Sequence, residues 1–204
     1  DKIKTNIEGQ IDSVQFNGYT YAQIQTNGIL QKQAYNGSIK IKDPNINFIS
    51  NLEVDFKENT PTFNAVGDLT NANLNALQFS NNQIQLTGLL DVNFTGSNID
   101  NFIGSAKFYN GKLKSTTNTI NFDSVSLKST IAKGNKQIIL SSDDIQASIA
   151  GKFNIDQLPN SVQYFLQGYF PNYIKNLKEA PVNQQFSFQV NTAYFEPYIR
   201  IFRS

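Results

Sequence analysis

The sequence predicts an all-β protein built from antiparallel strands, with one or two short helices. Apolar and polar residues alternate with a period of two through most of the 204 residues, as in strands with one apolar and one hydrated face. Turn-forming residues separate these runs, and only one stretch has a clear helical apolar pattern. The alternation is compatible with a β-sandwich, whose apolar faces are pressed together, and with a groove whose apolar face stays open.

The clearest alternation lies in segments 38–42, 51–57 and 90–95, segment 186–191 shows it as well, and weaker copies occur between residues 63 and 149. Because strands joined by a short turn normally pair, we expect segments 38–42 and 51–57 to be neighbours across the turn at 43–45. The apolar residues of the three clearest segments are expected to share one inner face. These candidate groove residues are Ile39, Ile41, Leu52, Val54, Phe56, Leu90, Val92 and Phe94.

Four Asn-Gly pairs are typical of two-residue hairpin turns: 17–18, 27–28, 36–37 and 110–111. The pair 27–28 is the exception, because Ile24 and Thr26 are in phase with Gly28 and Leu30. We therefore expect Gly28 inside a long strand, at a bulge or a close approach.

A helix is expected near residues 157–172. Val162, Phe165, Leu166 and Tyr169 form an apolar stripe at helical spacing, and prolines at 159 and 171 suit the two ends. A single helical turn is expected over 98–103, and the segment from 186 is expected to return to the sheet.

Composition argues against an enzyme. The chain has no His and no Cys, so the commonest general base, thiolate chemistry and the commonest metal ligands are all missing. Asp43, Asn45 and Asn47 have calcium-loop spacing, but Pro44 and the lack of a Glu nine residues beyond Asn47 favour a turn. We expect no cofactor and no metal.

Charge and hydropathy limit the partners. Lys and Arg number 17 and Asp and Glu number 16, which argues against a nucleic-acid surface. The chain has no run of about 20 apolar residues, no signal peptide and no initial Met. We expect a mature product or an excised piece of a longer chain.

Three stretches resemble TamB-like proteins of the AsmA-like superfamily, which belong to the Gram-negative cell envelope. The first is GSIKIKDPN at 37–45 with LEVDF at 52–56, within the run 21–56. The second is FTGSNIDNFIGSA at 94–106 with NGKL at 110–113, and the third is GKFNI at 151–155. The order and spacing of these stretches carry the resemblance, which covers about residues 17–188.

The resemblance implies a β-taco, in which long antiparallel strands curl into an open trough with an apolar inner face. It implies a periplasmic segment of a bridge between inner and outer membrane, anchored in the inner membrane in its full-length form. The implied role is phospholipid transport and support of outer-membrane assembly. The implied partners are lipid acyl chains, neighbouring segments of the same chain and an outer-membrane assembly barrel. Members have a membrane anchor and a partner-docking domain, so we expect this chain to be an internal segment.

Two other classes of function stay open from the residues alone. One is a β-sandwich adhesion or carbohydrate-binding module, which would carry exposed aromatic residues on a flat polar face. The other is a purely structural strand array, whose trough is filled by its own helix or by neighbours.

Overall fold

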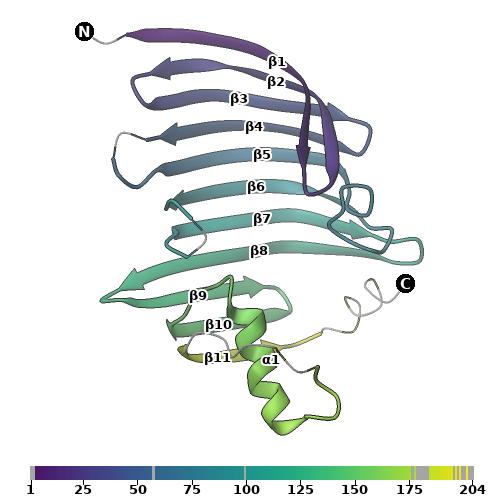
Figure 1. Cartoon of the computed structure of the whole chain (residues 1–204). Helices are drawn as coiled ribbons and strands as arrows, with labels where there is room; N and C mark the ends of the chain where they lie inside the picture. Colours follow the sequence, from purple (N-terminus) through teal and green to yellow (C-terminus); the bar gives the residue numbers. More distant parts are fainter. Residues whose placement is uncertain are drawn as a thin grey trace.

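The strands form one antiparallel sheet in which each strand pairs with the next along the chain (Figure 1). The computed structural model describes residues 3–194 except 57, 99, 176 and 178–183, together with Glu196, Tyr198 and Ile201. Within these residues the sheet has 11 strands. They are β1 (Lys4–Phe16), β2 (Tyr19–Gln31), β3 (Ala34–Asp43), β4 (Ile46–Asp55), β5 (Thr62–Asn73), β6 (Gln85–Thr95), β7 (Ile103–Lys114), β8 (Thr119–Ala132), β9 (Asn135–Ser142), β10 (Ile145–Lys152) and β11 (Gln185–Thr192).

This topology confirms the all-β prediction and the pairing expected across the turn at 43–45. In the β3–β4 pair, Asp43 lies opposite Ile46 and Ile41 lies opposite Phe48. The helix α1 (Leu158–Tyr169) falls where the apolar stripe predicted it, and β11 returns after it to pair with β10. The described strands belong to a single sheet, so the β-sandwich alternative does not apply to them.

A line of backbone irregularities crosses the sheet from β2 to β7. They lie at Gln23 in β2, Asn47/Phe48 in β4, Leu69–Ala72 in β5, Thr87–Leu89 in β6 and Asn110 in β7. Strand β3 is regular and lies between the irregularities of β2 and β4. Its Ile41 pairs with Ile24, next to Gln23, and its Lys42 pairs with Asn47, so the two irregularities are aligned across it. Bulges bend a strand and increase its twist, so an aligned row of them creases the whole sheet.

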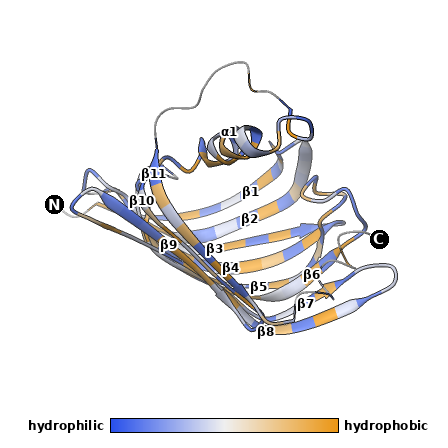
Figure 2. Cartoon of the chain, turned by 90° about the horizontal axis from the view of Figure 1, so that it is seen from below, coloured by the Kyte–Doolittle hydropathy of each residue, from blue (hydrophilic) through white to orange (hydrophobic). Residues whose placement is uncertain are grey.

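The creased sheet has the form of a trough whose axis runs across the strands, as the end view shows (Figure 2). Helix α1 lies on the open side of this trough, beside β9–β11 in both views (Figures 1 and 2). Eleven strands, about 4.8 Å apart, give the trough a length of about 48 Å. In the part of the chain that the structure describes, no helix is long and apolar enough to cross a membrane.

The tip of the β1–β2 hairpin folds over one side of the trough, and we call residues 12–23 the β1–β2 arm. Asn17 Nδ2 donates to the carbonyl of Gln78 in the β5–β6 loop at 3.0 Å. The buried Asp43 carboxylate holds the base of the arm: Tyr19 Oη donates to Oδ1, and the Ala22 N–H donates to Oδ2 at 2.9 Å. Burial and the Asp43 carboxylate both raise the pKa of Tyr19, so its hydroxyl stays a donor.

The β6–β7 loop covers the opposite side of the trough over β8–β10. Ser129 Oγ donates to the carbonyl of Phe102 at 2.8 Å, and Lys136 Nζ lies 2.9 Å from Asp100 Oδ1. Both Ser129 and Lys136 are buried, and the Lys136 ammonium also lies 5.0 Å from the centre of the Phe153 ring. Of the single helical turn expected over 98–103, the structure has only a turn in which the N–H of Asn101 donates to the carbonyl of Asn98 at 3.3 Å, and β7 begins at Ile103.

Two of the hairpin interpretations are also wrong. The Asn-Gly pairs at 36–37 and 110–111 lie inside β3 and β7, and not in turns. The pair at 17–18 does form a turn, and Gly28 lies inside β2 as expected. At Gly37 a Cβ would lie 2.4 Å from the Tyr35 hydroxyl, so glycine is needed there for a close approach.

Candidate functional site

One residue from each of the 11 strands forms a continuous apolar row along the trough. The pairing register places these residues side by side on one face of the sheet. We call this row the central track: Ile7, Gly28, Gly37, Leu52, Ala65, Val92, Ala106, Leu127, Leu140, Ala147 and Val190. Because paired residues of adjacent strands point to the same face, the track is a single surface without a polar side chain.

All eight candidate groove residues lie on the face of the central track. Leu52 and Val92 are members of it. Val54, Phe63 and Phe94 form part of the next row, and Phe63 stacks on Phe94 at 4.7 Å between ring centres. Ile39, Ile41 and Leu90 lie on the other side of the track. Phe56 follows β4 directly, and its ring contacts Phe63 edge-on at 6.0 Å.

The apolar face is the inside of the trough. Ser129 pairs with Gly104 and Lys136 pairs with Gly151, which places both side chains on the face of the central track. The β6–β7 loop covers both side chains. Apolar and hydrophilic residues alternate along the strands in Figure 2, as expected for a sheet with one apolar face. The loop and α1 therefore both lie on the apolar side of the sheet.

This inner face is only partly covered. None of the central track residues is buried: ten are half-buried, and Val190 is 56% exposed. Among the candidate groove residues, seven are half-buried and Phe56 is 51% exposed. In a sandwich, a second layer would bury such residues almost completely.

The buried core is small. Among the described residues only six apolar side chains are buried: Ala72, Leu77, Ile84, Phe122, Phe153 and Ile201. The chain exposes 13665 Å², whereas a compact protein of 22.9 kDa would expose about 9,600 Å². An excess in this direction is expected when one face of a large sheet is left open.

Aromatic rings lie close against glycines beside the track. A Cβ at Gly67 would lie 2.6 Å from Phe48, one at Gly88 would lie 2.5 Å from Phe108, and one at Gly111 would lie 2.0 Å from Phe122. The glycines therefore leave room for rings that would otherwise project into the trough.

The outer face of the sheet is polar and rich in amides. Asn64, for example, accepts a hydrogen bond from Asn93 Nδ2 at 2.7 Å, and Glu53 beside it is exposed. Outside the β1–β2 arm, the one aromatic residue on the described strands of this face is Tyr109, with Lys107 Nζ 5.6 Å from its ring centre. An array of exposed aromatic residues for stacking on sugars is therefore missing from this part of the described outer face.

Several of the described carboxylates are engaged in structural contacts. Asp43 Oδ1 accepts the N–H of Asn45 at 2.8 Å, as in a turn, and the described residues contain no cluster of three or more metal-ligating acids. Asp143 and Asp144 lie at the β9–β10 turn, where Asp143 accepts the N–H of Asp123 and Asp144 accepts the hydroxyl of Tyr198. Burial and the Asp144 charge raise the pKa of Tyr198.

The structure adds residues to the lining that the sequence pattern did not single out. Ile7 and Gly28 extend the central track to the β1 edge, and Leu127, Leu140 and Val190 extend it to the β11 edge. The signal for Val190 was present as alternation over 186–191, and that for Leu127 as a weaker copy. For Gly28 the only signal was its phase with Ile24 and Leu30, because a glycine has no side chain to mark a face.

Comparison of the chain with models of protein families, with curated proteins and with solved structures finds no match.

Proposed function

We propose that this chain is a groove segment that shields lipid acyl chains from water. The observation that carries the proposal is the central track, an apolar row that crosses all 11 strands and is not buried at any position. Exposing a 16-carbon chain to water costs on the order of 10 kcal/mol. A continuous apolar trough removes most of that cost for a chain lying along it.

The geometry of the central track suits movement of an acyl chain along the trough better than tight binding at one position. The rows repeat from strand to strand without a polar side chain in the track, so successive positions of an acyl chain would have similar energy. A polar headgroup would stay in water at the open side of the trough. No catalytic step is part of this function.

We place this segment in the periplasm, as part of a TamB-like bridge between inner and outer membrane that carries phospholipid and supports outer-membrane assembly. The open antiparallel trough supports this proposal, because it has the architecture that the resemblance implies. The proposed partners are phospholipid acyl chains and neighbouring segments of a longer chain.

A photo-crosslinking amino acid placed at Leu52 in the track tests the proposal, with the same substitution at Asn51 as the control. These neighbours point to opposite faces of β4. After expression in Gram-negative cells, we expect lipid adducts at position 52 and none at position 51. Native mass spectrometry of the unmodified chain should show co-purifying lipid. Equal labelling at both positions, or no adduct at either, would contradict the proposal.

A further inference from the structure

A second apolar surface lies on α1 and the residues that follow it. Its members are Val162, Tyr164, Phe165, Tyr169, Phe170 and Tyr173, which are 42–88% exposed, and we call them the aromatic patch. No residue from 158 to 174 carries a charge. An apolar group of this size on one short segment marks an interaction site.

The part of the chain that the structure describes leaves the aromatic patch largely exposed. None of the side chains of α1 is buried. Of the apolar stripe that predicted the helix, Val162, Phe165 and Tyr169 are exposed and Leu166 is half-buried.

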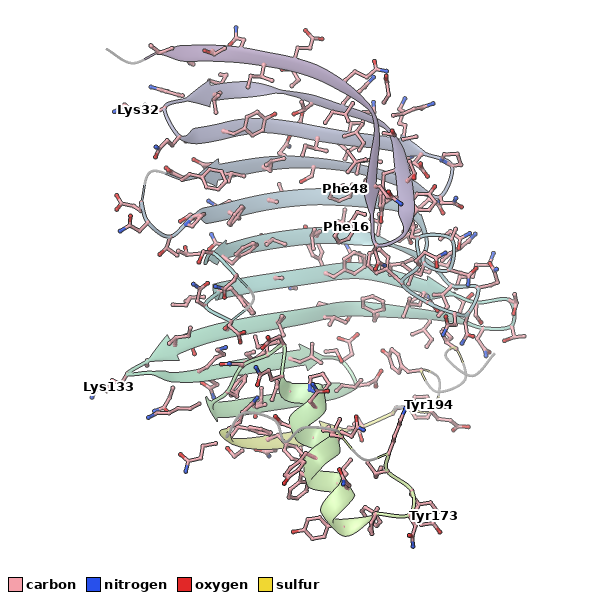
Figure 3. The ribbon with its side chains drawn as sticks, viewed as in Figure 1. Phe16, Lys32, Phe48, Lys133, Tyr173 and Tyr194 are labelled. Carbon is pink, nitrogen blue, oxygen red and sulfur yellow. The ribbon has the colours of Figure 1, made fainter. Side chains whose placement is uncertain are left out.

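The polar side of α1 is used to hold the returning chain. Gln163 Nε2 donates to the carbonyl of Lys175 at 2.7 Å, and the N–H of Leu177 donates to Gln167 Oε1 at 3.4 Å. These two bonds tie the segment after the helix to it. Figure 3 shows Tyr173 beyond the helix, on the side away from the strands.

We propose that the aromatic patch docks onto the surface of a lipid bilayer. The patch combines Phe and Val, which favour the hydrocarbon, with three tyrosines, whose rings carry a polar tip and favour the membrane–water interface. Its lack of charge matches the boundary layer of a bilayer and offers nothing to pair with a charged protein or an anionic headgroup. The inference rests on the proposed function in one respect, since docking there would bring a membrane to the open side of the trough.

This docking should depend little on the charge of the lipid and on the salt concentration. Because no charge lies on the patch, binding should need no anionic lipid. It should also change by less than about twofold between low and high salt, since screening acts only on charges. A basic membrane-binding helix would show the opposite behaviour on both counts.

The chain contains no Trp, so a single introduced Trp reports the environment of one site. We would compare Tyr169→Trp in the patch with Phe79→Trp, which replaces a residue 57% exposed in the β5–β6 loop. With vesicles of phosphatidylcholine alone, Tyr169→Trp fluorescence should shift to the blue and be quenched by brominated lipid. Phe79→Trp should show neither change.

A second pair of variants separates docking from groove binding. Phe165→Ser combined with Tyr169→Ser should lower vesicle binding by about tenfold or more, because two large apolar groups are lost. Phe79→Ser should leave it unchanged. Lipid co-purification by native mass spectrometry should persist in the double variant, so failure of docking and failure of the groove are distinguishable. The absence of a blue shift would overturn the proposal, as would a vesicle-independent dimer that the double variant abolishes.

Discussion

At the scale of single residues, the inner face is shaped by rings that lie over glycines. Phe122 is buried over Gly111, and Phe108 and Phe48 lie against glycines in the neighbouring strands. A ring in this position occupies the space that a Cβ would otherwise fill, and covers backbone. The smooth floor of the groove therefore depends on the absence of a Cβ at a few positions.

We expect Gly111→Ala to destabilise the protein by about 1–3 kcal/mol, because its Cβ would overlap the Phe122 ring and force it to move. Urea denaturation measures the change. Gly168→Ala is the matched control, because a Cβ there meets nothing within 4 Å and lies in a helix, where Ala is favoured. An equal loss of stability in both variants would contradict this explanation.

The Asp100–Lys136 pair is the other residue-scale feature, since it anchors the β6–β7 loop over the trough. Burial acts to raise the pKa of the Asp100 carboxyl. The Lys136 ammonium and the Ile155 N–H lower it by more, so the net pKa lies below 3.8. The Ile155 N–H donates to Asp100 Oδ1 at 2.6 Å, which links the loop to the chain after β10.

Asp100→Asn should cost about 1–3 kcal/mol at pH 7, because the buried Lys136 ammonium loses its carboxylate. The pKa of Asp100 is lower in the folded state, so its contribution is complete above the unfolded value of about 3.8 and is lost as the pH falls through the folded value. The difference in free energy of unfolding between parent and variant should stay constant from pH 7 to about 5 and disappear below about pH 4. Denaturation at several pH values tests this, and a difference that disappears near neutral pH would contradict it.

At the scale of elements, the β1–β2 arm is a strand pair that leaves the plane of the sheet. Gln23, with φ 52°, lies at its base, and Asp43 ties it to the β3–β4 turn. In Figure 3, Phe16 at the end of the arm lies in front of the strands, in the region of Phe48. The arm forms part of one wall of the trough.

Asp43→Ala should release the β1–β2 arm without unfolding the sheet. The Ala22 N–H and the Tyr19 hydroxyl would lose their acceptor, at a cost of about 1–3 kcal/mol. Hydrogen exchange should become faster in residues 12–23 and stay unchanged in β8–β10. Asp68→Ala, at an exposed position of β5, is the control and should change neither region.

At the scale of the whole molecule, the trough is a single layer with a small buried core and a large open face. Its stability must come mainly from strand pairing and from contacts between neighbouring side chains, since the described chain provides no second layer. A charge introduced into the inner face can therefore stay partly hydrated. In a sealed core it would not.

Val54→Asp should leave a folded β protein, at a cost of about 1–3 kcal/mol, but greatly reduce lipid bound at that part of the groove. Val54 is half-buried between Tyr35 and Phe63 in the register. Glu53→Lys, on the opposite face, should change neither folding nor lipid binding. Circular dichroism and lipid crosslinking are the measurements. Global unfolding of Val54→Asp, with no lipid crosslinks in the parent, would instead favour a closed apolar core.

The turns show where sequence reasoning is limited. An Asn-Gly pair is favourable in a two-residue turn because both positions tolerate positive φ, and the pair at 17–18 has this conformation. A glycine beneath a ring is needed for a different reason, namely space, as at Gly37 under Tyr35. The two requirements select the same residue, so Asn36-Gly37 could not be distinguished from a turn without knowing where Tyr35 lies.

The sequence by itself determined the antiparallel strands, the common face of the eight candidate groove residues and the position of the helix. The reason is that alternation with a period of two records the direction of each side chain, which depends only on the local backbone. The tertiary structure alone decided that this face stays open, that a row of bulges creases the sheet, and that most of the apolar stripe of α1 is left exposed. These features depend on which distant segments cover an apolar surface, and a covered and an uncovered apolar face are built from the same residues.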